Sequence, residues 1–116
     1  MFPALADRRN EKAGNLSGGQ QKVLEIGRAL MMTPRMMLLD EPSLGLAPRT
    51  AQMVFATIKR LRDEAGMTIL VVEQIARIAL KYAHRGYVLV TGNIALEGSA
   101  ADLARNDAIK KAYLGE

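Results

Sequence analysis

Two short apolar runs separated by one amphipathic segment constrain the fold of this chain most strongly. The runs cover residues 36–39 and 68–72, and each suits a strand that is buried on both faces. The segment between them begins as a helix at Pro48, carries apolar residues at helical spacing and ends at Gly66, a natural helix C-cap. A strand, a helix and a strand in this order predict a right-handed crossover with both strands parallel in one sheet. The sequence therefore predicts the α/β class.

The rest of the chain predicts short helices and one hairpin. Apolar runs at residues 87–90 and 94–97 flank Thr91-Gly92-Asn93, which indicates an antiparallel hairpin with a three-residue loop. Helices are expected from residue 18 to about Thr33, over about 75–83, and near 101–105 and 108–114. Because no repeat, low-complexity tract or linker interrupts this pattern, we expect a single α/β unit.

Composition excludes several classes of protein. Cysteine is absent from the 116 residues, so disulfides and thiolate metal sites are excluded. The apolar runs fall far below the roughly 18–20 residues of a membrane-spanning helix, and the first residues lack the order of a signal peptide. The net charge of +4 is scattered and aromatic residues make up 4%, so we expect a solvated surface and no nucleic-acid partner.

Polar side chains follow both apolar runs. Asp40 and Glu41 end the first run, and Glu73 and Gln74 end the second. Ligands of open α/β sheets bind outside the carboxyl ends of the strands, so these residues should share one crevice if the strands lie close together. Asp40 suits Mg²⁺, directly or through water, and Glu41 suits a base that polarises an attacking water. Taken alone, the pair is equally compatible with two exposed carboxylates that end a strand.

A Ser-Gly-Gly-Gln turn precedes the first long helix. Ser17 and Gln20 have the spacing of a capping box. Gly18 and Gly19 each cost about 1 kcal/mol in a helix relative to alanine, which makes sense if another group must approach the backbone closely. The exposed amides, the helix dipole and the Ser17 hydroxyl then form an anion site suited to a terminal phosphate. The alternative is a flexible turn, and the carboxylate pair further along the chain argues against it.

At these residues the chain resembles the ATP-binding subunits of ABC transporters. Leu16-Ser17-Gly18-Gly19-Gln20 matches the signature motif of that family, and residues 36–40 match its Walker B strand. Ser43-Leu44-Gly45-Leu46 stands at the D-loop, Glu41 at the catalytic base and Gln74 at the switch histidine. Further strings, including the closing Ala-Tyr-Leu-Gly, are similar to the second ATPase subunit of branched-chain amino acid importers.

The resemblance implies a fold, a site and ligands. The fold is the C-terminal half of a P-loop NTPase domain, with parallel strands, crossover helices, a C-terminal β-hairpin and short helices. The ligands are ATP and Mg²⁺; the catalytic residues are Glu41 and Gln74, and Asp40 binds nucleotide and holds Mg²⁺ through water. The signature residues act across a dimer, on nucleotide held mainly by a partner subunit: Leu16, Ser17, Gly18, Gly19 and Gln20.

Residues 1–116 depart from the family pattern in several ways. Ala47 replaces the usual D-loop aspartate, and Gln74 replaces the switch histidine, so it cannot become a cation. The only histidine, His84, fits no catalytic position and is expected at the surface or at an interface. No Gly-x-x-x-x-Gly-Lys-Ser/Thr loop and no Q-loop occur in these residues. We therefore expect a partial ABC ATP-binding domain that does not hydrolyse ATP alone.

The resemblance favours an importer ATPase, and two alternatives stay open. As an importer ATPase, the protein pairs with a second ATP-binding subunit and with transmembrane permease subunits, at the cytoplasmic face of the inner or plasma membrane. The first alternative is an ABC-type ATPase of non-transport function, such as DNA repair, whose long coiled-coil insertion does not occur here. The second alternative is a non-catalytic truncated remnant, which a reading frame truly beginning at Met1 would support.

Overall fold

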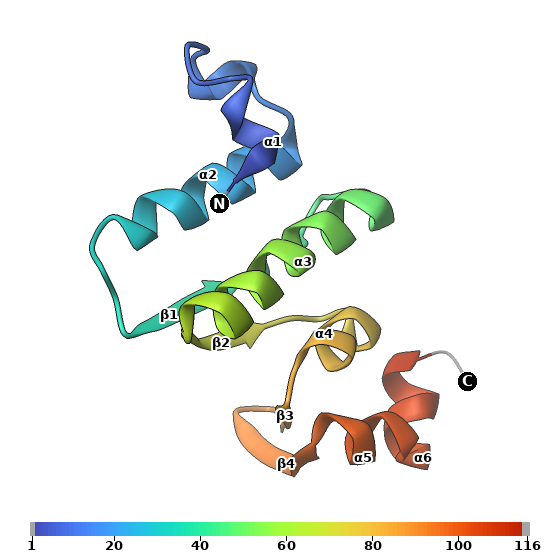
Figure 1. Cartoon of the computed structure of the whole chain (residues 1–116). Helices are drawn as coiled ribbons and strands as arrows, with labels where there is room; N and C mark the ends of the chain where they lie inside the picture. Colours follow the sequence, from blue (N-terminus) through green and yellow to red (C-terminus); the bar gives the residue numbers. More distant parts are fainter. Residues whose placement is uncertain (1, 115–116) are drawn as a thin grey trace. The chain divides into compact units, whose positions relative to one another are not determined.

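The chain forms two compact units in the computed structural model, which describes residues 2–114 (Figure 1). The first unit covers Met1–Glu73 and the second covers Gln74–Glu116. The first contains α1 (Pro3–Ala6), a 3₁₀ turn (Ala13–Asn15), α2 (Gly18–Leu30), β1 (Met36–Asp40), α3 (Pro48–Ala65) and β2 (Thr68–Val72). The second contains α4 (Ala76–Tyr82), β3 (Arg85–Val90), β4 (Asn93–Ser99), α5 (Ala100–Arg105), α6 (Asp107–Ile109) and a π-helical turn (Lys110–Leu114).

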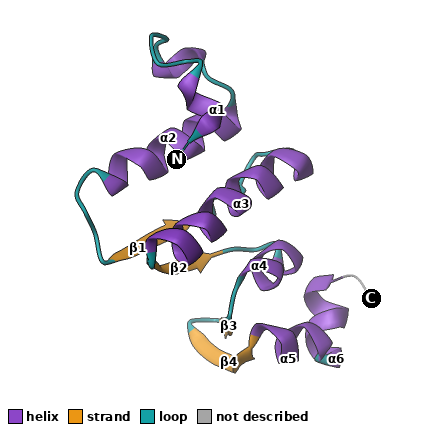
Figure 2. Cartoon of the chain, in the orientation of Figure 1, coloured by secondary structure: helices purple, strands orange, loops and turns teal. Residues whose placement is uncertain are grey.

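The predicted α/β class is confirmed (Figure 2). The chain expected to form a single unit divides after Glu73, and in the described residues each unit has its own two-stranded sheet. In the first unit β1 and β2 are parallel, in a register that runs from Met36 opposite Thr68 to Asp40 opposite Val72. The parallel pairing of the strands that α3 connects is therefore as predicted, and β1 extends one position beyond the apolar run, to Asp40.

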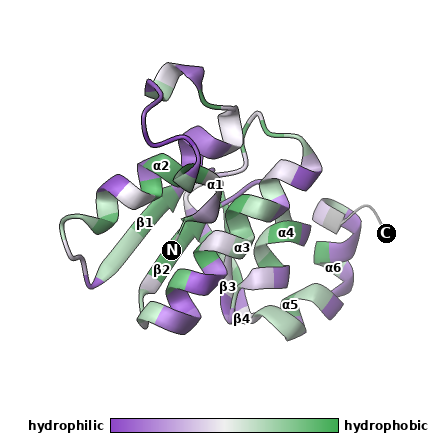
Figure 3. Ribbon diagram, turned by 45° about the horizontal axis from the view of Figure 1, so that its top comes forward, coloured by the Kyte–Doolittle hydropathy of each residue, from purple (hydrophilic) through white to green (hydrophobic). Residues whose placement is uncertain are grey.

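The strands of this parallel sheet are buried on one face only, whereas the sequence predicted burial on both. Successive side chains of a strand point to opposite faces. On one face Met37 is buried and its register partner Ile69 is half-buried. On the other face Leu38 is 68% exposed and Leu70 is 48% exposed. The physical reason is that α3 packs on β2 and α2 packs beside α3, which leaves the opposite, mostly apolar face open within residues 2–73 (Figure 3).

Helix α3 supplies a large part of the core of the first unit. It begins with Pro48 at its first position and ends at Gly66, whose φ of 65° is left-handed, as the sequence predicted. The buried side of α3 follows the helical period, and α2 adds Val23 and Ile26 to the same core. The buried residues of α3 are Ala51, Val54, Phe55, Ile58 and Leu61.

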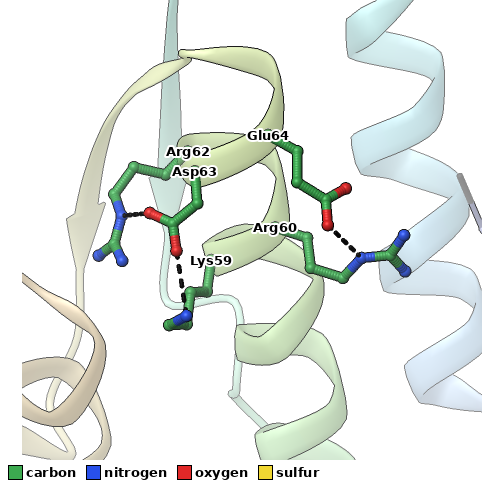
Figure 4. Close-up of polar contacts among 5 residues, drawn as sticks. All are labelled: Lys59, Arg60, Arg62, Asp63 and Glu64. Carbon is green, nitrogen blue, oxygen red and sulfur yellow. Dashed lines mark hydrogen bonds and ion pairs between the residues drawn. The ribbon is translucent and has the colours of Figure 1, made fainter.

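The opposite side of α3 carries ion pairs near its C-terminal end (Figure 4). Asp63 lies 2.7 Å from Arg62 Nε and 3.0 Å from Lys59 Nζ, and Arg60 lies 3.6 Å from Glu64. Hydrogen bonds from Arg62 and then Lys59 lower the pKa of Asp63 to about 2. Because most of these side chains are solvated, the pairs add little to the stability of the unit.

Helix α2 ends at Leu30, earlier than the predicted end near Thr33. The Met31 and Met32 amides each donate to a carbonyl three residues back, which tightens the last turn. Thr33 then adopts a φ of 50°, which is incompatible with a continuing right-handed helix. The backbone geometry of the turn, and not Pro34 alone, ends the helix.

The hairpin of the second unit has a two-residue connection. β3 and β4 are antiparallel, as predicted, but Asn93 pairs with Val90 and belongs to β4. The expected three-residue loop is therefore wrong. Thr91 and Gly92 connect the strands with φ values of 50° and 78°, and positive φ at both positions gives a tight turn whose twist matches that of the strands.

The short helices of the second unit lie close to their predicted positions. The amides of Ala108 and Ile109 donate to Asn106 Oδ1, which caps α6. The predicted helix over 108–114 is split into α6 and the π-helical turn. His84, directly before β3, is exposed as expected.

The left-handed conformation of Gly66 at the C-cap of α3 can be tested by substitution. Replacing Gly66 by alanine should lower the free energy of unfolding by about 1 kcal/mol, because a Cβ atom disfavours the left-handed conformation. No atom within 4 Å would clash with that Cβ, so the cost would come from the backbone alone. Urea unfolding measures it, with Gly14→Ala as the control, since Gly14 has equally open surroundings without a positive φ. Equal stability of the two variants would contradict the prediction.

Candidate functional site

The N-terminus of α2 is closed by the capping box that the sequence predicted. The Gln20 amide donates to Ser17 Oγ at 3.2 Å, and the Ser17 amide donates to Gln20 Oε1 at 3.0 Å. Ser17 Oγ acts as the acceptor in this cap, so the cap leaves its hydroxyl proton for another acceptor. Ser17 and Gly18 are exposed, so the turn presents polar groups to solvent.

The glycines of this turn are packed against another part of the first unit. A Cβ atom at Gly18 would lie 3.1 Å from Leu46 Cδ2. At Gly19, a Cβ atom would overlap Thr50 Cγ2 and would lie 3.1 Å from Met53 Cε. The sequence interpretation attributed both glycines to the close approach of a ligand. Within this chain, the groups that approach are Leu46, just before α3, and two side chains in the first turns of α3, whose packing alone accounts for Gly19.

The chain turns sharply at the carboxyl end of β1. Glu41 has a φ of 46°, in the left-handed region that non-glycine residues seldom adopt. Its amide donates to the Val72 carbonyl at 2.7 Å, which extends the pairing of β1 with β2 beyond Asp40. The Leu44 amide donates to the Glu41 carbonyl at 3.0 Å and closes the turn. The backbone of Glu41 is therefore fixed at the ends of both strands.

A side chain from the end of β2 also reaches this turn. The Ser43 amide donates to Glu73 Oε1 at 2.9 Å, although the two residues are 30 positions apart. Ser43 is 2% exposed, and no group within the described part of the chain hydrogen-bonds its Oγ. The sequence interpretation placed Glu73 at the strand end and gave it no role. The only available signal was the position of a carboxylate beside the Asp-Glu pair.

The expected juxtaposition at the strand ends is present in the first unit. Asp40, Glu41 and Glu73 lie together at the carboxyl ends of two paired strands. Gln74 follows Glu73 in the chain, is exposed and is the first residue of the second unit. His84 lies further along that unit, where its carbonyl accepts the Ala100 amide at 2.9 Å.

The chemistry of the strand ends suits a hydrated Mg²⁺. Asp40 is exposed and lines a cleft of about 240 Å³ together with Lys22 and Glu25 of α2. Within residues 2–114 no group of three or more His, Cys, Asp or Glu side chains could enclose a metal ion. Mg²⁺ usually keeps several waters and takes one or two carboxylates plus substrate phosphates. A single carboxylate such as Asp40 fits that mode of binding.

Comparison with known proteins finds similarity to one family. A family model described as "ABC transporter" matches residues 2–44, which include the capped turn and the Asp40-Glu41 pair. The chain is 50% identical over 115 residues to the high-affinity branched-chain amino acid transport ATP-binding protein BraG of Pseudomonas aeruginosa. That match covers 99% of this chain and 49% of BraG. Over nearly its whole length, the chain is similar to ABC transporter ATP-binding proteins.

Further relatives show the same similarity. The probable branched-chain amino acid transport ATP-binding protein LivF of Archaeoglobus fulgidus is 38% identical over 98% of this chain and 48% of its own length. The crystal structure of the ADP conformation of MJ1267, an ATP-binding cassette of an ABC transporter, has a TM-score of 0.80 and 36% identity, over 99% of this chain and 48% of that chain. The chain thus spans about half the length of the relatives it matches.

The helices in the described part of the chain are short or polar by the standard of membrane spans. Across residues 2–114, none has the length and apolar character needed to cross a bilayer. The longest, α3, carries charged residues along its exposed side.

The packing of Gly19 in the signature turn can be tested by substitution. Gly19→Ala should lower the free energy of unfolding by about 1–3 kcal/mol, because the new methyl group overpacks against Thr50. Gly27→Ala is the matched control in the same helix, since its Cβ would meet Phe2 at an ordinary 3.4 Å. That variant should be neutral or slightly more stable, because alanine has the higher helix propensity.

A second substitution identifies the cause of the loss. Thr50→Ser removes the methyl group that a Cβ at position 19 would overlap. Chemical denaturation of the double variant Gly19→Ala/Thr50→Ser should therefore show most of the stability restored. A loss of the same size with and without Thr50→Ser would show that packing on α3 is not the reason for this glycine.

Proposed function

We propose that the chain is part of an ATP-hydrolysing subunit of an ABC importer, with branched-chain amino acids as the cargo. The observation that carries the proposal is the Asp40-Glu41 pair, held at the joined ends of two parallel strands in a chain of this family. Carboxylates in that position suit nucleoside triphosphate hydrolysis. The similarity to BraG and LivF supports the cargo class.

The 116 residues form one part of an ABC ATP-binding domain in this proposal. The open face of the β1–β2 sheet supports this, because its apolar residues Leu38 and Val72 are 68% and 56% exposed. Apolar surface of this kind is usually covered in a stable domain. The relatives are about twice as long, so they contain further chain that could pack on this face. By family resemblance, the phosphate-binding loop and the Q-loop belong to that further chain.

In this proposal, each residue at the strand ends has a separate role in ATP hydrolysis. Mg²⁺, when bound, neutralises charge on the phosphates of the substrate ATP. Asp40 would hold the ion through water, and its exposed position at the end of β1 is suitable. Glu41 would polarise the attacking water as a general base. Gln74 would hydrogen-bond a phosphate oxygen or that water through its amide, and it stays uncharged at every physiological pH.

The capped turn would complete the nucleotide site of a second ATP-binding subunit. Its residues are Leu16, Ser17, Gly18, Gly19 and Gln20. Exposure of Ser17 and Gly18 at the start of a 13-residue helix supports this role, since helix N-termini attract phosphate. Closure and reopening of such a dimer would drive transmembrane permease subunits. The proposed location is therefore peripheral, at the cytoplasmic face of the membrane.

Substitution of the proposed base tests the function. In the full-length natural protein, Glu41→Gln should keep nucleotide binding and lose ATP turnover by about 100-fold or more, because the amide cannot accept a proton. Phosphate release measures turnover, and a fluorescent ATP analogue measures binding. Glu64→Gln is the control, since Glu64 is an exposed carboxylate on α3 that pairs with Arg60. Undiminished hydrolysis in Glu41→Gln would mean that Glu41 is not the base.

Residues 1–116 by themselves should not turn over ATP. Their sequence contains no phosphate-binding loop, and therefore no lysine to hold the β- and γ-phosphates. Purified residues 1–116 with Mg²⁺ and ATP should release phosphate no faster than the same residues carrying Glu41→Gln. Turnover clearly above that control would refute the prediction.

A further inference from the structure

The hydrogen bond between Glu73 and Ser43 joins two segments that are distant in sequence. Glu73 directly follows β2, and Ser43 lies two positions after Glu41, in the turn beyond β1. The bond from the Ser43 amide to Glu73 Oε1 is 2.9 Å long and partly buried. Many other side-chain hydrogen bonds of the chain join residues only a few positions apart. This bond therefore fixes tertiary structure in a way that those local contacts do not.

The last residue of β2 and the residue after it both hold the turn that contains Glu41. The Val72 carbonyl accepts the Glu41 amide at 2.7 Å, and the Glu73 carboxylate accepts the Ser43 amide at 2.9 Å. Glu41 lies between these anchors with a φ of 46°. A non-glycine residue keeps such a conformation only where its surroundings over-determine it. The direction in which the Glu41 side chain leaves the backbone thus depends on both links.

Loss of the Glu73 acceptor would leave a buried donor without its partner. Ser43 is 2% exposed, so its amide could reach water only if the turn opened. An opened turn would release Glu41 from its left-handed conformation. A displacement of about 1 Å in a catalytic group can lower a rate by as much as 100-fold.

We propose that Glu73 is a positioning residue, which fixes the turn after β1 and so orients the carboxylate of Glu41. The inference rests on the proposed role of Glu41 as general base. Glu73 acts in it through its reach and its hydrogen-bond acceptor, and its charge is not required. One of its two carboxylate oxygens is already engaged by the Ser43 amide, which argues against Glu73 as a second base or a metal ligand.

Three substitutions separate reach from charge. Glu73→Gln keeps the reach and the acceptor oxygen and loses the charge, whereas Glu73→Asp keeps the charge and loses the reach. Glu73→Ala loses both. Glu64→Ala on α3 is the control for removal of an exposed carboxylate away from the strand ends. All are made in the full-length natural protein, with measurement of kcat and KM for ATP and of hydrogen exchange at the Ser43 amide.

The positioning role predicts a specific pattern. Glu73→Gln should keep the Ser43 amide protected and keep kcat within about threefold of the wild type, because the hydrogen bond survives. Glu73→Asp and Glu73→Ala should accelerate exchange of that amide and lower kcat by about tenfold or more, with KM for ATP little changed. A merely structural defect would not spare KM or be rescued by glutamine.

Other outcomes would overturn the inference. Full activity in Glu73→Asp with a loss in Glu73→Gln would show that charge, and not reach, matters. Unchanged Ser43 exchange or unchanged kcat in Glu73→Ala would refute the positioning role alone. A wild-type protein without turnover, or full turnover in Glu41→Gln, would overturn the proposed function and the positioning role with it. The Glu41→Gln control therefore distinguishes the two failures.

Discussion

The parallel pairing of β1 with β2 is the interaction on which the rest of the first unit depends. It fixes the register from Met36 to Asp40 and continues through the Glu41 amide to the Val72 carbonyl. Since parallel strands end at the same edge, this register determines which polar residues meet. α3 is the crossover that the pairing requires, and its buried side forms much of the core. The geometry of the turn after Asp40 follows from the same pairing.

The beginning of α3 links this strand end to the capped turn of α2. Leu46, just before α3, lies against Gly18, and the Thr50 methyl group would overlap a Cβ atom at Gly19. The two motifs that are separated in sequence therefore share one packed region of the first unit. Gly19 is required by the packing of this turn on Thr50, whereas Ser17 and Gly18 are exposed and could make the proposed contact with a partner's nucleotide.

Local chemistry made most of the elements predictable. The capping box at Ser17, the first-turn Pro48 and the left-handed Gly66 each act through the nearest few residues, and all were found as predicted. The errors occurred where a local pattern permits more than one geometry. Thr91 and Gly92 adopt positive φ, which shortens the hairpin loop. Thr33 also adopts positive φ, and α2 ends before the predicted position. Burial of the β1–β2 sheet was overestimated, because an apolar run does not reveal whether one face or both faces of the sheet are covered.

For the candidate site, the sequence alone determined the residue types and the order of the elements, which suffice to place Asp40 and Glu41 at a strand end. Hydrophobic spacing and capping chemistry are local, so they can be read from neighbouring residues. Only the tertiary structure decided that Glu73 reaches the Ser43 amide and that Thr50 occupies the space beside Gly19. Both contacts join distant segments, and their geometry depends on the register of two strands and the packing of two helices, which no local pattern encodes.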